Sequence, residues 1–196
     1  MDIAFSPLEG RLIRLEPFTP DLKEEVQRAL DCDPDTWSIL PLNGRGDGFA
    51  FYWSNALGRN PAGARMPYAI RTLHDDTVAG TSSLFTTNIT HYGLEIGATF
   101  LTPAVRGGFV NIEAKKLMLA HAFDAGAIRV QFSIDTRNLR SQAAVSKLGA
   151  RKDGVLRSNQ ITWTDYVRDT AVYSILRHEW PDLRARLDER LSNHLT

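Results

Sequence analysis

The residues best suited to chemistry lie in the turn Val105-Arg-Gly-Gly-Phe-Val110, which precedes an amphipathic segment. The first turn of a helix has backbone N–H groups without intrahelical acceptors, so it attracts anions such as phosphate. Gly107 and Gly108 have no Cβ, which lets ligand oxygens approach the backbone and permits positive φ. A pyrophosphate is therefore the first ligand to consider, although similar glycine turns occur in α/β proteins that bind nothing there.

A carboxylate stands just upstream, in the alternating run 92–101, which predicts a strand. Alternation puts one set of residues on the apolar face: Tyr92, Leu94, Ile96, Ala98 and Phe100. The opposite face should carry the others: Gly93, Glu95, Gly97, Thr99 and Leu101. Glu95, flanked by glycines that leave room for a ligand, is the first candidate for a general base, directly or through water. A solvated or salt-bridged strand carboxylate is the alternative.

Several other kinds of site fail on spacing. The glycine turn lacks the lysine of G-x-x-x-x-G-K-[ST] and does not satisfy G-x-G-x-x-G, so nucleoside-triphosphate and dinucleotide sites are not expected. The histidines form no H-E-x-x-H arrangement and have no cysteine pair beside them, so no metal site is expected. Cys32 is the only cysteine, which excludes an internal disulfide and fits a reducing compartment.

These residues need a scaffold, and the hydrophobic pattern predicts one of strands and helices. Strands are expected at residues 10–17, 67–73, 78–88, 92–101, 128–135, 151–163 and 167–177, with tight turns at 74–77 and 163–165. Helices are expected at 19–31, 49–57, 111–126, 139–148 and 182–191, the last of them started by Trp180-Pro181. Asn111 and Asn138 should cap two of them, and Thr19 a third. Two β-α-β crossovers imply locally parallel strands in an otherwise antiparallel sheet.

The segment 33–65 is rich in turn formers. Its aromatic residues are Trp37, Phe49, Phe51, Tyr52 and Trp53. They could form a lid over the core, which we favour, or wall a substrate slot. Its acidic residues, Asp33, Asp35 and Asp47, add negative charge that a cationic substrate could use.

Composition indicates one globular domain, residues 1–196. The chain is 43% hydrophobic and 23% charged, which suffices to fill one core. Its 23 basic and 23 acidic residues balance, so no global field favours nucleic acid or an anionic membrane surface. No window offers about 18 uninterrupted apolar residues, and residues 1–7 lack the features of a signal peptide. We therefore expect a cytoplasmic protein with no membrane partner.

Four stretches of the chain form a specific set. They are Glu95-Ile-Gly-Ala-Thr-Phe-Leu, Pro103-Ala-Val-Arg-Gly-Gly-Phe-Val-Asn-Ile-Glu-Ala-Lys, Asn138-Leu-Arg-Ser-Gln-Ala-Ala-Val-Ser-Lys-Leu-Gly149, and Arg157 with Arg168-Asp169-Thr-Ala-Val-Tyr-Ser-Ile. With them the chain resembles, over nearly its whole length, the GCN5-related N-acetyltransferase (GNAT) superfamily and its RimJ/RimL-like ribosomal-protein N-acetyltransferase branch. The resemblance implies an α/β (α+β) fold, with a mixed, mostly antiparallel sheet of about seven strands that splays in the middle between flanking helices.

The resemblance also implies a coenzyme site. Backbone amides of the turn would hold the pyrophosphate, namely those of Val105, Arg106, Gly107, Gly108, Phe109, Val110 and Asn111. The strand end, Phe100, Leu101 and Thr102, would pair with the pantetheine arm. Asn138 and Ser141 would lie near the thioester, and Ser141 resembles the serine proposed to protonate the leaving thiolate. No metal is implied.

Two departures from the family pattern affect these assignments. Arg106 satisfies the start of R/Q-x-x-G-x-G/A, but Phe109 and Asn111 stand where small residues are usual, a variant similar to the RimJ/RimL branch. Val145 stands where many members place a tyrosine acid, so that role would fall to Ser141 or to solvent. Tyr173 and His74 are weaker candidates for the base.

We therefore expect an acetyl-CoA-dependent N-acetyltransferase, with coenzyme A between the strand ending at Leu101 and the strand starting at Ile128. The acceptor would be a primary amine, of a peptide or protein N-terminus or of a small molecule. Positioning should dominate the rate, because a thiol with a pKa near 8.5 is a tolerable leaving group. A non-catalytic acyl-CoA-binding or regulatory module on the same fold is the alternative. The oligomeric state is open, with a homodimer as one option.

Overall fold

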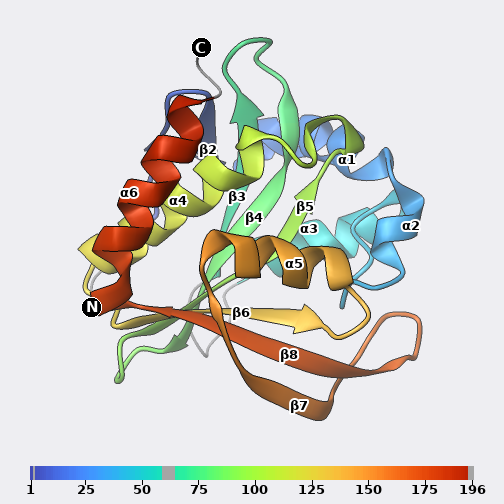
Figure 1. The fold of residues 1–196 in the computed structure, drawn as a ribbon. Coiled ribbons are helices and arrows are strands. Elements are labelled where there is room, and N and C mark those ends of the chain that lie inside the picture. Colours follow the sequence, from blue (N-terminus) through green and yellow to red (C-terminus); the bar gives the residue numbers. More distant parts are fainter. Residues whose placement is uncertain (2, 59–64, 194–196) are drawn as a thin grey trace.

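The predicted strands pair into one sheet, whose order among the described residues is β1-β2-β3-β4-β5-β6-β8-β7 (Figure 1). The structure is a computed structural model that describes residues 1, 3–58 and 65–193. Its strands are β1 (Leu8–Glu9), β2 (Ile13–Pro17), β3 (Arg65–Thr72), β4 (Val78–Asn88), β5 (Gly93–Leu101), β6 (Arg129–Asp135), β7 (Arg151–Ile161) and β8 (Val167–Leu176). The mixed, mostly antiparallel α+β fold is confirmed, with the two-residue β1 added to the seven strands expected.

Helices cover both faces of the sheet (Figure 1). They are α1 (Lys23–Asp31), α2 (Pro34–Trp37), α3 (Phe49–Leu57), α4 (Phe109–Asp124), α5 (Leu139–Leu148) and α6 (Trp180–Ser192). On one face α4, α5 and α6 pack around the main core, to which Leu119, Val145 and Leu187 belong. On the other face α1, α2 and α3 pack around a smaller cluster that includes Trp37 and Tyr52. None of the described helices is long and apolar enough to span a bilayer.

β5 and β6 are parallel neighbours that separate along their length. Their pairing covers only residues 93–95 of β5 and 129–131 of β6. Beyond this level β5 continues beside β4, and β6 continues beside β8. A gap therefore opens at the carboxyl ends of both strands. This is the end of parallel strands at which α/β proteins commonly bind ligands.

The second crossover differs from the expectation. β8 lies between β6 and β7 and pairs antiparallel with both, so β6 and β7 run parallel without being neighbours. β8 takes the inner position because it buries apolar side chains such as Ala171 and Ile175, whereas β7 is exposed along its whole length. The tight turn expected at 163–165 is present, with Asp165 at a φ of +60°.

Helix boundaries agree with the sequence patterns in part. α3 has the predicted bounds, and α5 is capped by Asn138 and followed by Gly149 at a φ of +112°. α1 instead begins after a 3-10 turn, η1 (Pro20–Leu22), and the Thr19 side chain makes no capping hydrogen bond. α6 runs from Trp180 to Ser192 and has Pro181 in its first turn, in agreement with the expected start of the helix at Trp180-Pro181.

The alternation expected for β5 is wrong beyond its middle. Ala98 has a φ of +48° where the pairing with β4 shifts register. Such a β-bulge moves the side chains that follow it to the opposite face. Phe100, expected on the face of Leu94 and Ile96, consequently packs in the smaller cluster. Glu95 precedes the bulge and lies, as expected, on the face of β5 opposite to that of Leu94.

The aromatic residues of segment 33–65 mostly form a lid. Trp37, Phe49, Tyr52 and Trp53 are buried in the smaller cluster, whereas Phe51 is 62% exposed. Residues 59–64 of this segment, which include the turn formers Pro61 and Gly63, lie outside the described residues.

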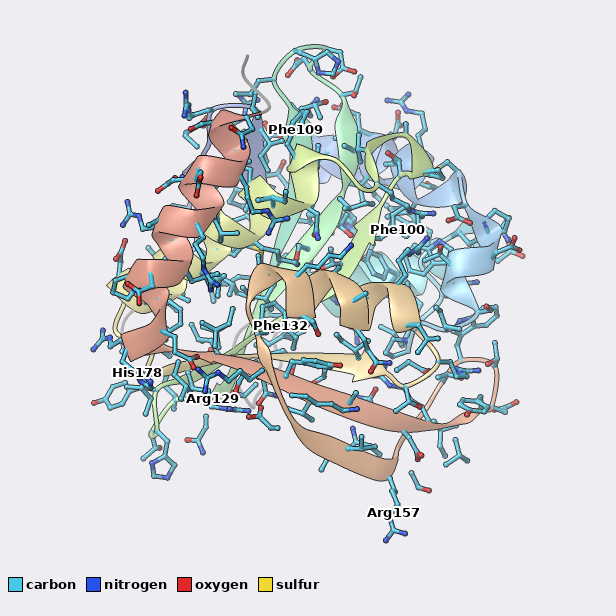
Figure 2. The ribbon with its side chains drawn as sticks, viewed as in Figure 1. Phe100, Phe109, Arg129, Phe132, Arg157 and His178 are labelled. Carbon is cyan, nitrogen blue, oxygen red and sulfur yellow. The ribbon has the colours of Figure 1, made fainter. Side chains whose placement is uncertain are left out.

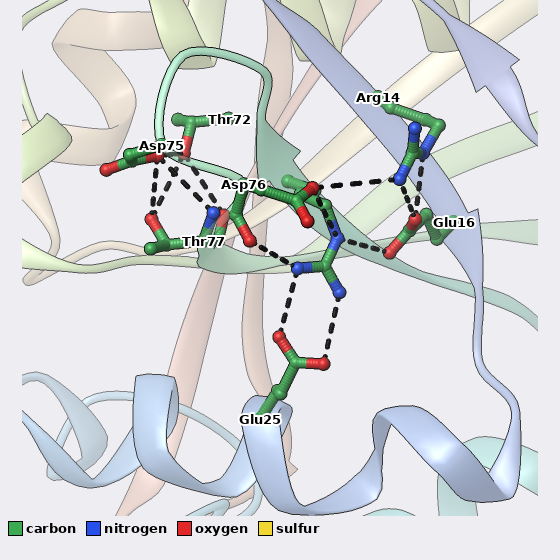
Figure 3. A network of polar contacts seen from close by, with 8 residues as sticks. Arg14, Glu16, Glu25, Thr72, Asp75, Asp76 and Thr77 are labelled. Atoms are coloured by element: carbon green, nitrogen blue, oxygen red, sulfur yellow. Dashed lines mark hydrogen bonds and ion pairs between the residues drawn. The ribbon is translucent and has the colours of Figure 1, made fainter.

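Ion pairs around Arg71 attach α1 to the sheet (Figure 3). Arg71 Nε lies 2.9 Å from Glu16 Oε2 on β2, and its NH1 lies 3.0 Å from Glu25 Oε2 on α1. Hydrogen bonds from Arg71 hold the pKa of Glu25 below its usual value, against the opposing effect of burial. The turn beside this network carries His74, whose side chain is 74% exposed and pairs with the adjacent Asp75.

Candidate functional site

The turn after β5 leads directly into α4, which begins at Phe109 (Figure 2). Gly108 is its N-cap, and Gly107 has a φ of +79°, a conformation that favours glycine. A Cβ added at Gly107 would meet no atom within 4 Å, so this backbone is open. The prediction that Asn111 caps α4 is wrong, because the two glycines let the helix begin two residues earlier. Asn111 is the third helical residue, and its N–H still belongs to the first turn.

The first turn of α4 is suited to an anion. Its backbone N–H groups belong to Phe109, Val110 and Asn111, and the turn contains no acidic residue. The positive end of the helix dipole is therefore not neutralised within the helix. The side chain of Val110 is buried and anchors this turn in the main core.

The Arg106 side chain ties the turn to α2. Its Nε donates to the carbonyl oxygen of Leu101 at 2.9 Å, and its NH2 lies 2.6 Å from Asp33 Oδ2. The Thr36 hydroxyl and Arg106 both donate to Asp33, and together they hold its pKa below the usual value although burial opposes them. Asp33 thus has a cationic partner already, which weakens the expectation that it meets a cationic substrate.

The end of β5 presents its backbone to both sides. The N–H of Thr102 donates to the carbonyl of Ala79 on β4 at 2.9 Å. Because backbone groups alternate along a strand, those of Leu101 point toward the gap beside β6. Phe100 anchors the strand end from behind, since its ring stacks on Trp37 with the centroids 5.0 Å apart.

Glu95 lies where β5 and β6 separate. Its Oε2 accepts hydrogen bonds from Gln131 Nε2 at 2.8 Å and from Ser133 Oγ at 2.9 Å. Both partners are neutral, and the described residues contain no ion pair to Glu95 within 4.0 Å. A Cβ on Gly97 would lie 3.1 Å from Oε1, so the glycine leaves space beside that oxygen. Glu95 is half-buried and oriented, as a carboxylate that accepts a proton must be.

The start of α5 holds the other predicted residues. Asn138 Oδ1 accepts a hydrogen bond from the N–H of Ser141 at 3.0 Å, which caps the helix. Ser141 is half-buried in the first turn. Val145 is buried in the main core. The hydroxyl of Tyr173, also buried, donates to Gln142 Oε1 at 3.1 Å.

The glycine turn and the start of α5 face one cavity of about 490 Å³. It is lined by Asp33, Asp35, Thr36, Ile39, Arg106, Arg137, Asn138, Leu139 and Arg140. Thr36 bridges its two sides, since its Oγ1 accepts from NH2 of Arg106 and NH2 of Arg140, each at 3.4 Å. Of the predicted site residues the cavity joins Arg106 and Asn138, whereas Glu95 and Ser141 do not line it.

The sequence patterns did not single out Gln131 and Ser133, which surround Glu95, and they gave no role at the site to Arg168, a member of the motif set. Arg168 is 3% exposed and donates to Thr170 Oγ1 at 3.1 Å and to the Ser133 carbonyl at 3.3 Å. Burial lowers the pKa of Arg168, against the opposing effect of two nearby carboxylates. For Gln131 and Ser133 the available signal was the polar half of the alternation in β6, because those residues share a face with Glu95.

One residue of the motif set lies outside this site. Arg157, part of the motif set, sits on the exposed strand β7 and points away from the molecule (Figure 2). No group of three or more His, Cys, Asp or Glu side chains among the described residues is arranged to hold a metal ion.

A family model, the acetyltransferase (GNAT) domain, matches residues 12–151. Among curated proteins no significant match was found. Among solved structures, one from T. thermophilus, described as an acetyltransferase, is 37% identical. The alignment covers 97% of this chain and all (100%) of that one, with a TM-score of 0.86.

Two more distant structures share the fold. A GCN5-related N-acetyltransferase from Brucella melitensis is 24% identical over 95% of this chain and 85% of its own, with a TM-score of 0.85. Mycobacterium smegmatis RimJ, solved in complex with CoA-disulfide, is 20% identical over 94% of this chain and 92% of its own, with a TM-score of 0.77.

Proposed function

The chain belongs to the GNAT family of acetyltransferases, and we propose that it is an acetyl-CoA-dependent N-acetyltransferase acting on a primary amine. The observation that carries the proposal is the position of Glu95 at the level where β5 and β6 part. The anion-binding first turn of α4 and the first turn of α5 follow the same two strand ends. A donor held by the helix turns would therefore extend along the gap toward a candidate base.

The donor would be held mainly by backbone groups. The N–H groups of the glycine turn and of the first turn of α4 would bind the pyrophosphate, since they lie at the positive end of the helix dipole. The backbone N–H of Leu101, directed toward the gap, would pair with a carbonyl of the pantetheine arm, since the Leu101 carbonyl already accepts from Arg106 Nε. Coenzyme A as the donor is supported by M. smegmatis RimJ, a structure of the same fold that was solved in complex with CoA-disulfide.

The chemistry would then be amine attack on the thioester. The neutral amine nitrogen attacks the carbonyl carbon, a C–N bond forms, and the C–S bond breaks. Glu95, directly or through water, takes the proton that the amine loses, and the thiolate takes a proton from Ser141 or from solvent. Holding amine and thioester in attack geometry contributes roughly 7–11 kcal/mol, which exceeds what either proton transfer supplies.

The acceptor side favours an amine in a polar setting. Glu95, Gln131 and Ser133 form a hydrogen-bonded group on the sheet face that α1 to α3 also cover. We assign the chain to the RimJ/RimL-like branch because its glycine turn carries Phe109 and Asn111. The proposed acceptor is a peptide N-terminus or a small amine, and the proposed location is the cytoplasm. A non-catalytic acyl-CoA-binding module is the second candidate.

Calorimetric titration with acetyl-coenzyme A, followed by thiol release over a panel of amines and peptides, tests the proposal. Binding with turnover on at least one amine is the expected result. Binding without turnover on any amine would favour the regulatory module. No binding at all would refute both functions.

A further inference from the structure

The β-bulge in β5 immediately precedes the strand end that we assign to the donor. The residue pairs that flank it are Gly97 with Ser83 and Phe100 with Thr81. Ser82 of β4 therefore faces two residues of β5, Ala98 and Thr99, of which Ala98 has a φ of +48°. A positive φ in a residue with a side chain is held only where surrounding contacts maintain it.

One side chain of α4 reaches into this bulge. Lys115 Nζ donates to Thr99 Oγ1 at 2.6 Å and to Ser82 Oγ at 3.1 Å. The two hydroxyl oxygens are themselves 2.8 Å apart, so amine and hydroxyls form a closed triangle. Both strands at the irregularity are thus bound to a single nitrogen.

The amine is buried without an acidic partner. Lys115 is 4% exposed, and no carboxylate lies within 4.0 Å of its Nζ among the described residues. The adjacent carboxylate on α4, that of Glu113, accepts from the backbone N–H groups of residues 11–13 instead. Burial lowers the pKa of Lys115 to about 7. Burying an amine costs more free energy than burying an apolar side chain of the same size. The presence of Lys115 in this core therefore points to a role other than packing.

We propose that Lys115 is a positioning residue of the donor site, which fixes the bulge in β5 and thereby the direction of the Leu101 backbone. This rests on the proposed function, because the Leu101 groups are those assigned to the pantetheine arm. The physical reason is register: a strand that gains or loses one residue turns all later groups to the other side. Without the bulge, Leu101 would present its backbone to β4 and Phe100 would leave its stack with Trp37.

The test is Lys115→Met, which removes the nitrogen and keeps the side-chain volume. Calorimetry with coenzyme A as the probe should show a Kd raised about tenfold, because loss of register displaces donor groups by an ångström or more. The KM for the amine acceptor should change less than twofold. The free energy of unfolding should rise, since a buried amine is lost. If Lys115 had only a structural role, Lys115→Met would raise the free energy of unfolding without lowering the affinity for coenzyme A.

Matched variants sharpen the result. Lys116→Met alters the next residue, which pairs with Asp188 of α6 at the surface, and should leave the Kd unchanged. Thr99→Val should reproduce the effect of Lys115→Met, and Thr99→Ser should restore affinity. The Lys115→Met and Thr99→Val double variant should be no worse than either alone. If Lys115→Met does not fold, the Kd values of Thr99→Val and Thr99→Ser for coenzyme A test the proposal instead.

Hydrogen exchange separates this proposal from the proposed function. Amides of residues 98–101 should exchange faster in Lys115→Met than in the parent chain or in Lys116→Met, a readout that needs no coenzyme. Unchanged exchange or an unchanged Kd for coenzyme A would overturn the role of Lys115. A parent chain that does not bind coenzyme A would refute the proposed function while leaving the exchange result to decide whether Lys115 holds the bulge.

Discussion

Ser133 on β6 donates a hydrogen bond to Glu95 on β5, with 2.9 Å between Ser133 Oγ and Glu95 Oε2. The backbone pairing of the two strands ends at the level of Glu95 and Gln131, so this side-chain bond crosses strands that are separating. It orients the carboxylate at the point where the gap begins. A base that acts on an incoming amine needs this kind of fixed position.

Glu95→Gln should lower kcat by about 10²–10⁴-fold, the usual range for losing a general base. The Kd for coenzyme A should stay within twofold, because the donor is held by other groups. Ser133→Ala, which removes one orienting bond and leaves the carboxylate, should reduce kcat by a smaller factor. Steady-state kinetics with calorimetry measures both, and undiminished turnover in Glu95→Gln would remove Glu95 as the base.

Ser141→Ala should lower kcat about tenfold if the serine protonates the leaving thiolate, and should not alter coenzyme affinity. The helix cap survives, since Asn138 bonds the backbone N–H of Ser141 rather than its hydroxyl. Tyr173→Phe is the control, because the Tyr173 hydroxyl is bound to Gln142. A rate for Ser141→Ala equal to that of the parent would assign protonation of the thiolate to solvent.

Gly107→Glu should weaken coenzyme A binding at least tenfold, since it places a negative charge at the positive end of α4 and strains a φ of +79°. Gly126→Glu, at the other end of the same helix with a φ of +104°, carries similar strain without the anion site. Gly107→Ala separates strain from charge and should have the milder effect. Equal losses of affinity in the two glutamate variants would argue against an anion site at the glycine turn.

Lys115→Met should make the protein more stable in a pH-dependent way. Burial lowers the pKa of Lys115 to about 7 in the folded chain from 10.5 in the unfolded chain. Between these values the unfolded chain binds the extra proton, so the free energy of unfolding of the parent rises with pH. The gain from Lys115→Met should therefore be largest below pH 7, a few kcal/mol by linkage, and should shrink toward pH 10.

Urea unfolding at pH 6, 8 and 10 measures this difference, with Lys116→Met as the control that should show little pH dependence. A gain that is the same at all three pH values would mean that Lys115 is not the group that titrates.

Local patterns predicted most of the fold. The strands and the bounds of α3 follow from hydrophobic periodicity. The start and end of α5 follow from Asn138 and Gly149. All of these signals act within a few residues. The start of α4 was placed wrongly, because Gly107 and Gly108 allow the helix to begin before Asn111. The position of β7 beside β6 was also misjudged, since the burial of β8 places that strand between them.

The sequence by itself determined the strand, glycine turn and helix of the proposed anion site. It also determined that Glu95 lies on the face of its strand opposite to Leu94, because both features depend on backbone geometry over adjacent residues. Only the tertiary structure decided what surrounds them. The bulge at Ala98, the bonds of Glu95 to Gln131 and Ser133, and the reach of Lys115 to Thr99 join segments far apart in the chain. Such contacts depend on register and packing, which no local pattern encodes.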